Sequence, residues 1–286
     1  MSKAKLVSSS FPSTQQVIVA GVALSFVSIL FYLLAPIETT GNGVFARPLW
    51  YRYGTYLLQT VAISASGLLC LRNWRSPKIA SGRNVWLGLG VGIVSWGIAN
   101  LIFGYMDLIE GKPPASPAIT DLFYVIAYIS LSLGMAMSVI GRRLNLLPKQ
   151  WSIVGAISLF GLAFAVFVTF IAGTSEGKTV NFTDPAKLLN TFYALGDVWM
   201  LVVATILLMA FWGGKFAQSW RLLGAAGISM FFGDLAYNFA LNVATEANPY
   251  QSGDWVEFFW ILSFVLFGMG AALEFDLSSR PSSRKR

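Results

Sequence analysis

Apolar stretches of about 20 residues recur along the whole chain, and no other feature constrains its fold as strongly. A helix needs about 20 residues to cross the hydrocarbon core of a bilayer. Charged residues make up 12% of the chain, which is about half the share found in a typical soluble domain. We therefore expect an all-α membrane protein, an eight-helix transmembrane bundle with spans at 17–36, 53–71, 85–106, 121–141, 151–173, 188–212, 221–242 and 255–274.

Basic residues are divided unevenly between the two sides that these spans define. The tails and alternate loops carry 15 of the 20 lysines and arginines, and the other side carries nine of the 13 acids. Because basic segments stay in the cytoplasm, we expect a cytoplasmic N-terminal tail (1–16), a transmembrane domain (17–275) and a basic cytoplasmic C-terminal tail (276–286). The net charge of +7 then reflects topology and contact with the lipid bilayer, and we expect no nucleic-acid partner.

The residue inventory excludes several kinds of chemistry. The chain contains no histidine and a single cysteine, Cys70. Histidine-ligated haem, histidine metal sites and histidine-dependent nucleophilic catalysis are therefore excluded, and no disulfide can form within one chain. We expect a protein that is not an enzyme, and the sequence leaves any cofactor unknown.

One polar-to-aromatic segment occurs twice. "PPASPAITDLFYVIAY" (113–128) and "NPYQSGDWVEFFWILSF" (248–264) align without a gap when the chain is shifted by 136 positions. We expect a tandem duplication of a four-helix unit, with repeat 1 at about 17–141 and repeat 2 at about 151–275. Since four is an even number, both repeats would have the same orientation in the membrane.

The duplicated segment has two open interpretations. In the first it only returns a helix to the membrane: Pro113 and Pro249 keep the loop from continuing the preceding helix, and Thr120 and Asp121, or Ser252 and Asp254, cap the following helix. In the second the two copies form the mouth of an extracytoplasmic pocket, whose residues would be Pro113, Ser116, Asp121, Pro249, Ser252, Asp254 and Glu257.

Two aspartates lie inside predicted membrane spans, where ionisable side chains are costly and often functional. At 1.5 Å per residue, Asp197 and Asp234 sit ~12–14 Å below the outer end of the apolar span. Three roles stay open for them: hydrogen bonding between helices, a ligand or ion site, and a proton relay. Other polar residues of the outer half would join such a site, namely Gln59, Asn100, Asn190, Tyr193, Tyr237 and Asn238.

Two segments resemble a known family. "PPASPAITDLFYVIAYISLSLGM" (113–135) is similar to the P-x-P-S-x-A-D-x-x-Y-L-x-x-Y-P-L-L-x-x-G-L pattern of polytopic membrane modules at the N-termini of bacterial signalling proteins. "FYALGDVWMLVVATILLM" (192–209) resembles their Y-P-x-G-D-L-x-L-L helix, although Ala194 stands where the family often has proline. Those modules often precede diguanylate cyclase, phosphodiesterase or kinase domains, and here we expect no output domain. The resemblance implies a sensory module of a bacterial inner or internal membrane, with another membrane or cytoplasmic signalling protein as its partner.

These features favour a non-enzymatic sensory, regulatory or partner-binding module with a small-ligand or ion pocket in the outer half of the bundle. A transporter or channel of four-plus-four repeat design is one alternative, and an assembly or scaffold factor of a membrane complex is another. A through path needs polar residues on both sides, whereas cytoplasmic halves such as "LLCLRNW" and "MAFWGG" offer no matching acids.

The predicted topology has a direct test. A reporter fused after Arg286 should be active only in the form that reports a cytoplasmic location, because the basic segments hold that side in the cytoplasm. Activity of a reporter that works only outside the cytoplasm would contradict this orientation.

Overall fold

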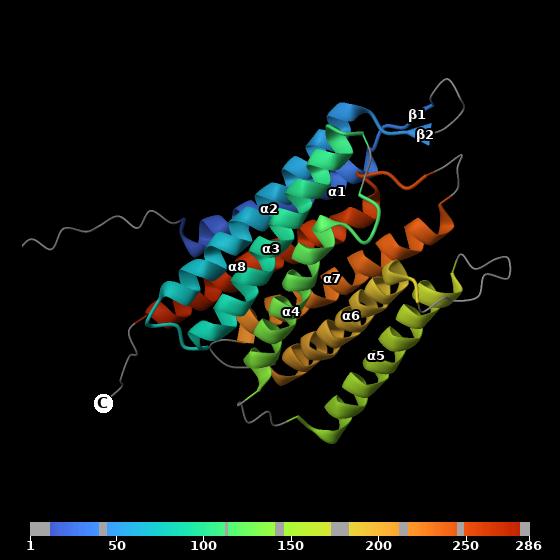
Figure 1. The fold of residues 1–286 in the computed structure, drawn as a ribbon. Coiled ribbons are helices and arrows are strands. Elements are labelled where there is room, and N and C mark those ends of the chain that lie inside the picture. The colour runs from blue at the N-terminus through green and yellow to red at the C-terminus, as the bar shows by residue number, and fades with distance from the viewer. Residues whose placement is uncertain are drawn as a thin grey trace, which may run out of the picture.

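The structure is a computed structural model, and it describes residues 12–39, 45–111, 114–140, 146–172, 183–211, 217–244 and 249–280. Within these ranges eight long α-helices form a bundle (Figure 1), which confirms the all-α, eight-helix prediction. Their bounds are α1 (Thr14–Leu33), α2 (Leu49–Arg75), α3 (Arg83–Leu108), α4 (Ile119–Val139), α5 (Pro148–Val166), α6 (Pro185–Ala210), α7 (Ala217–Val243) and α8 (Phe258–Ser279).

Three kinds of short element accompany the helices. A π-helical turn, η1 (Phe167–Ile171), extends α5, and a 3₁₀ turn, η2 (Trp255–Glu257), precedes α8. Strands β1 (Glu38–Thr39) and β2 (Phe45–Ala46) pair antiparallel in the connection between α1 and α2. The sequence did not predict this small ladder, because two-residue strands carry no periodic signal.

Among the described residues, seven helical segments are long and apolar enough to cross a membrane, so the chain is a multi-pass membrane protein. The remaining helix, α7, is not among them, although 221–242 was predicted as a span. It carries Arg221, Asp234, Asn238 and Asn242 among its residues. It lies between α6 and α8 in the bundle, with Asp234 buried. A helix shielded by its neighbours can keep polar side chains that a lipid-facing helix cannot.

The helices pack as two layered groups that meet along two seams. α3 packs between α2 and α4, and α7 packs between α6 and α8. The contacts of α2 with α8 and of α4 with α6 join the groups (Figure 1). A shift of 136 positions exchanges α2 with α6 and α4 with α8, so it also exchanges these two seams. The pattern is the one that a duplication of these helices would produce, and the duplication itself stays a prediction.

The first helix of each predicted repeat departs from this symmetry. α1 packs mainly on α8, whereas α5 packs on α6 at the edge of the bundle (Figure 1). Exposed side chains on both helices are largely apolar, such as Val19, Phe26, Leu159 and Phe160. These surfaces suit contact with lipid tails.

The two ends of the bundle differ in charge. At one end Thr14 of α1 donates a hydrogen bond to the Ala272 carbonyl (3.2 Å), and the Ala80 amide donates to the Ser278 hydroxyl (3.1 Å). This end, called the basic end below, carries the predicted cytoplasmic residues that the structure describes, among them Arg72, Arg75, Lys78, Arg83 and Arg280. The opposite end carries both copies of the duplicated segment.

Glycine sets the distance between α3 and α4. A Cβ atom built on Gly88 would lie 2.9 Å from the Gly134 Cα, and one built on Gly134 would lie 2.8 Å from the Leu89 nitrogen. Real Cβ atoms do not approach backbone so closely, so any side chain here must push the helices apart. Small residues allow this kind of close approach between membrane helices.

We expect Gly88→Ala to lower the free energy of unfolding by about 1–3 kcal/mol, the usual cost of overpacking. Gly155→Ala on α5 is the matched control, because a Cβ atom there meets nothing within 4 Å. That change should be neutral or slightly stabilising. Thermal unfolding of the detergent-solubilised protein measures both, and equal melting temperatures would contradict the close approach of α3 and α4.

Candidate functional site

A cavity of about 220 Å³ lies at the end of the bundle opposite the basic end. Six helices contribute to its wall, namely α2, α3, α4, α6, α7 and α8, together with both copies of the duplicated segment. Aromatic and polar side chains dominate the lining, which consists of Tyr56, Gln59, Trp96, Asn100, Phe103, Pro114, Ser116, Thr120, Asp121, Tyr124, Tyr128, Asn190, Tyr193, Asp234, Tyr237, Asn238, Leu241, Tyr250, Ser252, Glu257 and Trp260.

Most residues selected from the sequence lie at this cavity. Of the predicted ligand or ion site, every member except Asp197 lines it: Gln59, Asn100, Asn190, Tyr193, Asp234, Tyr237 and Asn238. Of the predicted mouth, Ser116, Asp121, Ser252 and Glu257 line it. Pro249 and Asp254 do not, and Pro113 lies outside the described residues.

The two membrane aspartates meet at a tyrosine. The hydroxyl of Tyr128 on α4 lies 2.9 Å from Oδ1 of Asp197 and 2.8 Å from Oδ2 of Asp234. All three side chains are buried. Asp234 and Tyr128 line the cavity, and Asp197 lies behind them without lining it. The structure therefore brings the two carboxyls together, but only one of them faces the cavity.

Hydrogen-bond counting indicates that this group holds a shared proton. The Tyr128 hydroxyl has one hydrogen and can donate to one carboxyl only, so its other contact requires a protonated carboxyl as the donor. Oδ2 of Asp197 is buried and has no hydrogen-bond partner within the described part of the chain. One proton between two adjacent carboxyls leaves one negative charge on the pair.

Further donors fix Asp234 and Asp121. The indole nitrogen of Trp260 donates to Oδ1 of Asp234 (2.8 Å). The Tyr193 hydroxyl donates to Oδ1 of Asp121 (2.9 Å). Oδ2 of Asp121 accepts from the Ala118 amide at the start of α4 (2.7 Å).

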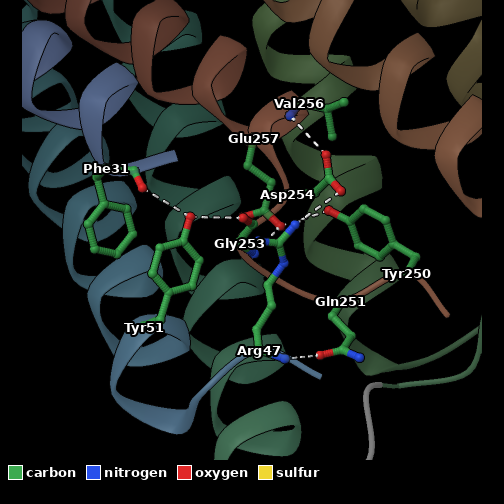
Figure 2. A network of polar contacts seen from close by, with 9 residues as sticks. All are labelled: Phe31, Arg47, Tyr51, Tyr250, Gln251, Gly253, Asp254, Val256 and Glu257. Atoms are coloured by element: carbon green, nitrogen blue, oxygen red, sulfur yellow. Dashed lines mark hydrogen bonds and ion pairs between the residues drawn. The ribbon is translucent and has the colours of Figure 1, made fainter. Parts of the chain in front are cut away.

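Glu257 is the most extensively hydrogen-bonded acid of the cavity. Its Oε1 accepts from the Tyr250 hydroxyl (2.7 Å) and from the Gly253 amide (2.9 Å) (Figure 2). Its Oε2 accepts from Nε2 of Gln59 (2.6 Å). Burial, with the Glu257 carboxyl close by, raises the pKa of the Tyr250 hydroxyl well above its usual value. Tyr250 therefore keeps its hydrogen and acts as a donor. Three donors therefore satisfy both oxygens of the Glu257 carboxyl group.

The second copy of the duplicated segment is tied to α2 and to the strand before it. The Arg47 amide donates to Oε1 of Gln251 (2.8 Å), and its guanidinium pairs with Asp254 at 3.4 Å (Figure 2). The Tyr51 hydroxyl donates to the Gly253 carbonyl at 3.1 Å. Gly253 has a φ of 99°, a backbone angle that residues other than glycine rarely adopt.

The capping prediction was right for two residues and wrong for two. Asp121 accepts from the Ala118 amide, and Asp254 accepts from the Val256 amide (3.4 Å) at the start of η2. Thr120 and Ser252 line the cavity instead. The Ser252 hydroxyl lies 2.8 Å from that of Tyr56, which also donates to Asp107. Asp107 in turn forms an ion pair with Arg52.

Sequence reasoning missed several lining residues, above all Tyr128, Trp96 and Tyr250. One signal was available for Tyr128, because it follows Asp121 by seven residues and so lies on the same face of α4. Trp96 and Tyr250 carried no comparable signal. Aromatic residues are common in membrane helices and at their ends, so type and spacing did not distinguish these two from others.

Comparisons with known proteins give no relative from which a function can be transferred. No protein-family model matches the chain, no curated protein matches it, and no solved structure matches its fold.

We expect Tyr128→Phe to lower the free energy of unfolding by about 1–3 kcal/mol, because two buried carboxyls lose the hydroxyl between them. Tyr105→Phe is the matched control, since Tyr105 lies on α3 with 57% of its surface exposed. Thermal unfolding in detergent compares the two. A melting temperature unchanged in Tyr128→Phe would show that the Asp197–Tyr128–Asp234 contact adds no stability.

Proposed function

We propose that the protein is a non-enzymatic sensory or regulatory module of the membrane that binds a small ligand in this cavity. The main support for this proposal is that α2, α3 and α4 line one part of the cavity wall and α6, α7 and α8 line the other. A ligand bound there contacts both groups of helices. Its binding free energy then favours the placement of the two groups that it fits best, and a partner protein can respond to that placement.

The interior between the cavity and the basic end supports a closed site over a transport path. Large side chains that are almost fully buried fill this layer, including Trp86, Leu89, Met135, Met200, Leu207 and Trp220. The Trp86 and Trp220 rings lie 6.5 Å apart between centroids, so aromatic rings from α3 and α7 meet there. A transporter would have to separate this packed layer in each cycle, whereas a ligand-sensing module can leave it intact.

The orientation and the partner belong to the same proposal. The distribution of basic residues supports a cavity that opens away from the cytoplasm. The resemblance to membrane modules of bacterial signalling proteins supports a membrane or cytoplasmic signalling protein as the partner that responds to ligand binding.

Thermal unfolding of the protein with a library of compounds tests ligand binding, and a variant with a filled cavity shows whether a compound binds in the cavity. Asn100→Phe places a larger side chain in the cavity wall, and Leu101→Phe is the control on the next residue, which is 59% exposed. A ligand at 100 times its Kd stabilises its receptor by about 2.7 kcal/mol. We expect this stabilisation in the native protein and in Leu101→Phe, and its loss in Asn100→Phe.

Two outcomes would contradict the proposal. In one, a compound library with cationic, neutral and anionic members stabilises no form of the protein. In the other, every stabilising compound acts equally on Asn100→Phe and on Leu101→Phe. Transport of a stabilising compound into proteoliposomes would instead favour the transporter.

A further inference from the structure

Six aromatic rings form a continuous row along the cavity wall. Ring centroids are 5.0 Å apart for Tyr193 and Tyr128, 5.8 Å for Tyr128 and Trp96, and 6.2 Å for Trp96 and Trp260. The row of rings continues from Trp260 to Tyr237, whose centroids are 5.3 Å apart, and from Tyr237 to Tyr250, at 4.9 Å. All six residues line the cavity. Aromatic faces carry partial negative charge and attract cations, most strongly where water is excluded.

Carboxyl groups supply negative charge to the same wall. Asp121, Asp234 and Glu257 line the cavity, and none of the described lining residues is a lysine or an arginine. The hydrogen bonds that these acids accept come from neutral donors: tyrosine hydroxyls, an indole, an amide side chain and backbone amides. Neutral donors hold the carboxyls in place without cancelling their charge.

Nearby basic side chains are engaged elsewhere. Arg47 pairs with Asp254, and Arg52 pairs with Asp107. Lys187 donates to the Thr169 carbonyl and lies over the Phe170 ring, on the side of the bundle that faces α5 and η1. Among the residues that the structure describes, the acidic and basic side chains that line the cavity are therefore carboxyls only, and a wall of one sign with low-dielectric surroundings focuses the field on the space within.

Asn100 adds an unused hydrogen-bond donor. Its side chain lines the cavity with only 6% of the residue exposed, and Nδ2 has no hydrogen-bond partner among the residues that the structure describes. Buried amide groups without partners are rare, and each calls for a ligand, a water or another explanation. A ligand oxygen is the acceptor that this donor lacks.

From these observations we infer that the cavity binds a small organic ammonium ion that also carries an oxygen acceptor, such as an amino alcohol. This inference rests on the proposed function. The ammonium group lies among the aromatic rings and the carboxyls, and its oxygen accepts from Asn100. A volume of about 220 Å³ exceeds the ~150 Å³ cavities that admit benzene, so it suits an organic cation better than a bare metal ion. A free amino alcohol and the choline headgroup of a lipid both carry an ammonium group and an oxygen acceptor.

Choline and its uncharged carbon isostere provide the decisive pair of probes, because they differ only in the atom that bears the charge. The full chain in nanodiscs of phosphatidylglycerol is titrated with each, and thermal unfolding and tryptophan fluorescence are recorded. Choline should raise the melting temperature and change the fluorescence of Trp96 and Trp260, and the isostere should do neither. Nanodiscs that contain phosphatidylcholine identify the source: stabilisation without added choline indicates the lipid headgroup.

Two variant pairs locate the effect. Asp234→Asn removes a lining charge at constant volume and should weaken choline binding about tenfold or more. Its control is Asp276→Asn, since Asp276 pairs with Arg280 at the basic end. Trp96→Leu should weaken binding more than Trp96→Phe, because phenylalanine keeps an aromatic face. Each variant is compared with its own ligand-free melting temperature, so a loss of stability does not mimic a loss of binding.

The outcomes separate this inference from the proposed function. Equal stabilisation by choline and by its isostere, abolished in Asn100→Phe, would overturn the ammonium inference and keep the ligand cavity. Choline binding that Asp234→Asn leaves unchanged would also overturn it. If neither free choline nor the lipid headgroup stabilises the protein, the ligand class is wrong, and the library screen decides on the cavity separately.

Discussion

Carboxyl groups within the apolar part of a membrane must find their hydrogen-bond partners inside the protein, because lipid tails offer none. That constraint organises one end of this bundle. Asp197 and Asp234 turn inward from α6 and α7 and meet the Tyr128 hydroxyl on α4. Trp260 of α8 completes the set by donating to Asp234. Four helices are thus held in register by one polar contact group, and the cavity forms beside it.

The duplicated segment acquires a structural meaning at this cavity. Asp121 and Glu257 occupy matching positions in the two copies, and both line the same space. Their partners differ, however: Tyr193 and the Ala118 amide hold Asp121, whereas Gln59 holds Glu257 together with residues of its own loop. The two similar segments therefore build one wall from unlike hydrogen bonds, which gives the cavity two chemically distinct sides.

We propose that an aromatic, carboxyl-lined cavity above a packed apolar layer serves recognition rather than passage. Side chains from α2, α3 and α4 face those from α6, α7 and α8 across it. Any ligand that bridges them adds a contact between helix groups that otherwise touch along two seams. A local binding event can in this way act on the placement of whole helices.

The sequence by itself determined the number of helices, their approximate bounds and the gathering of polar residues at one end, since hydropathy and charge report directly on the bilayer. Only the tertiary structure decided that Asp197 lies behind Tyr128, that Tyr193 turns to Asp121, and that Trp96 and Tyr250 join the wall. Such details depend on the rotation of each helix about its axis and on which helices are neighbours. Close contacts such as that between Gly88 and Gly134 set both, and these contacts join residues far apart in the chain.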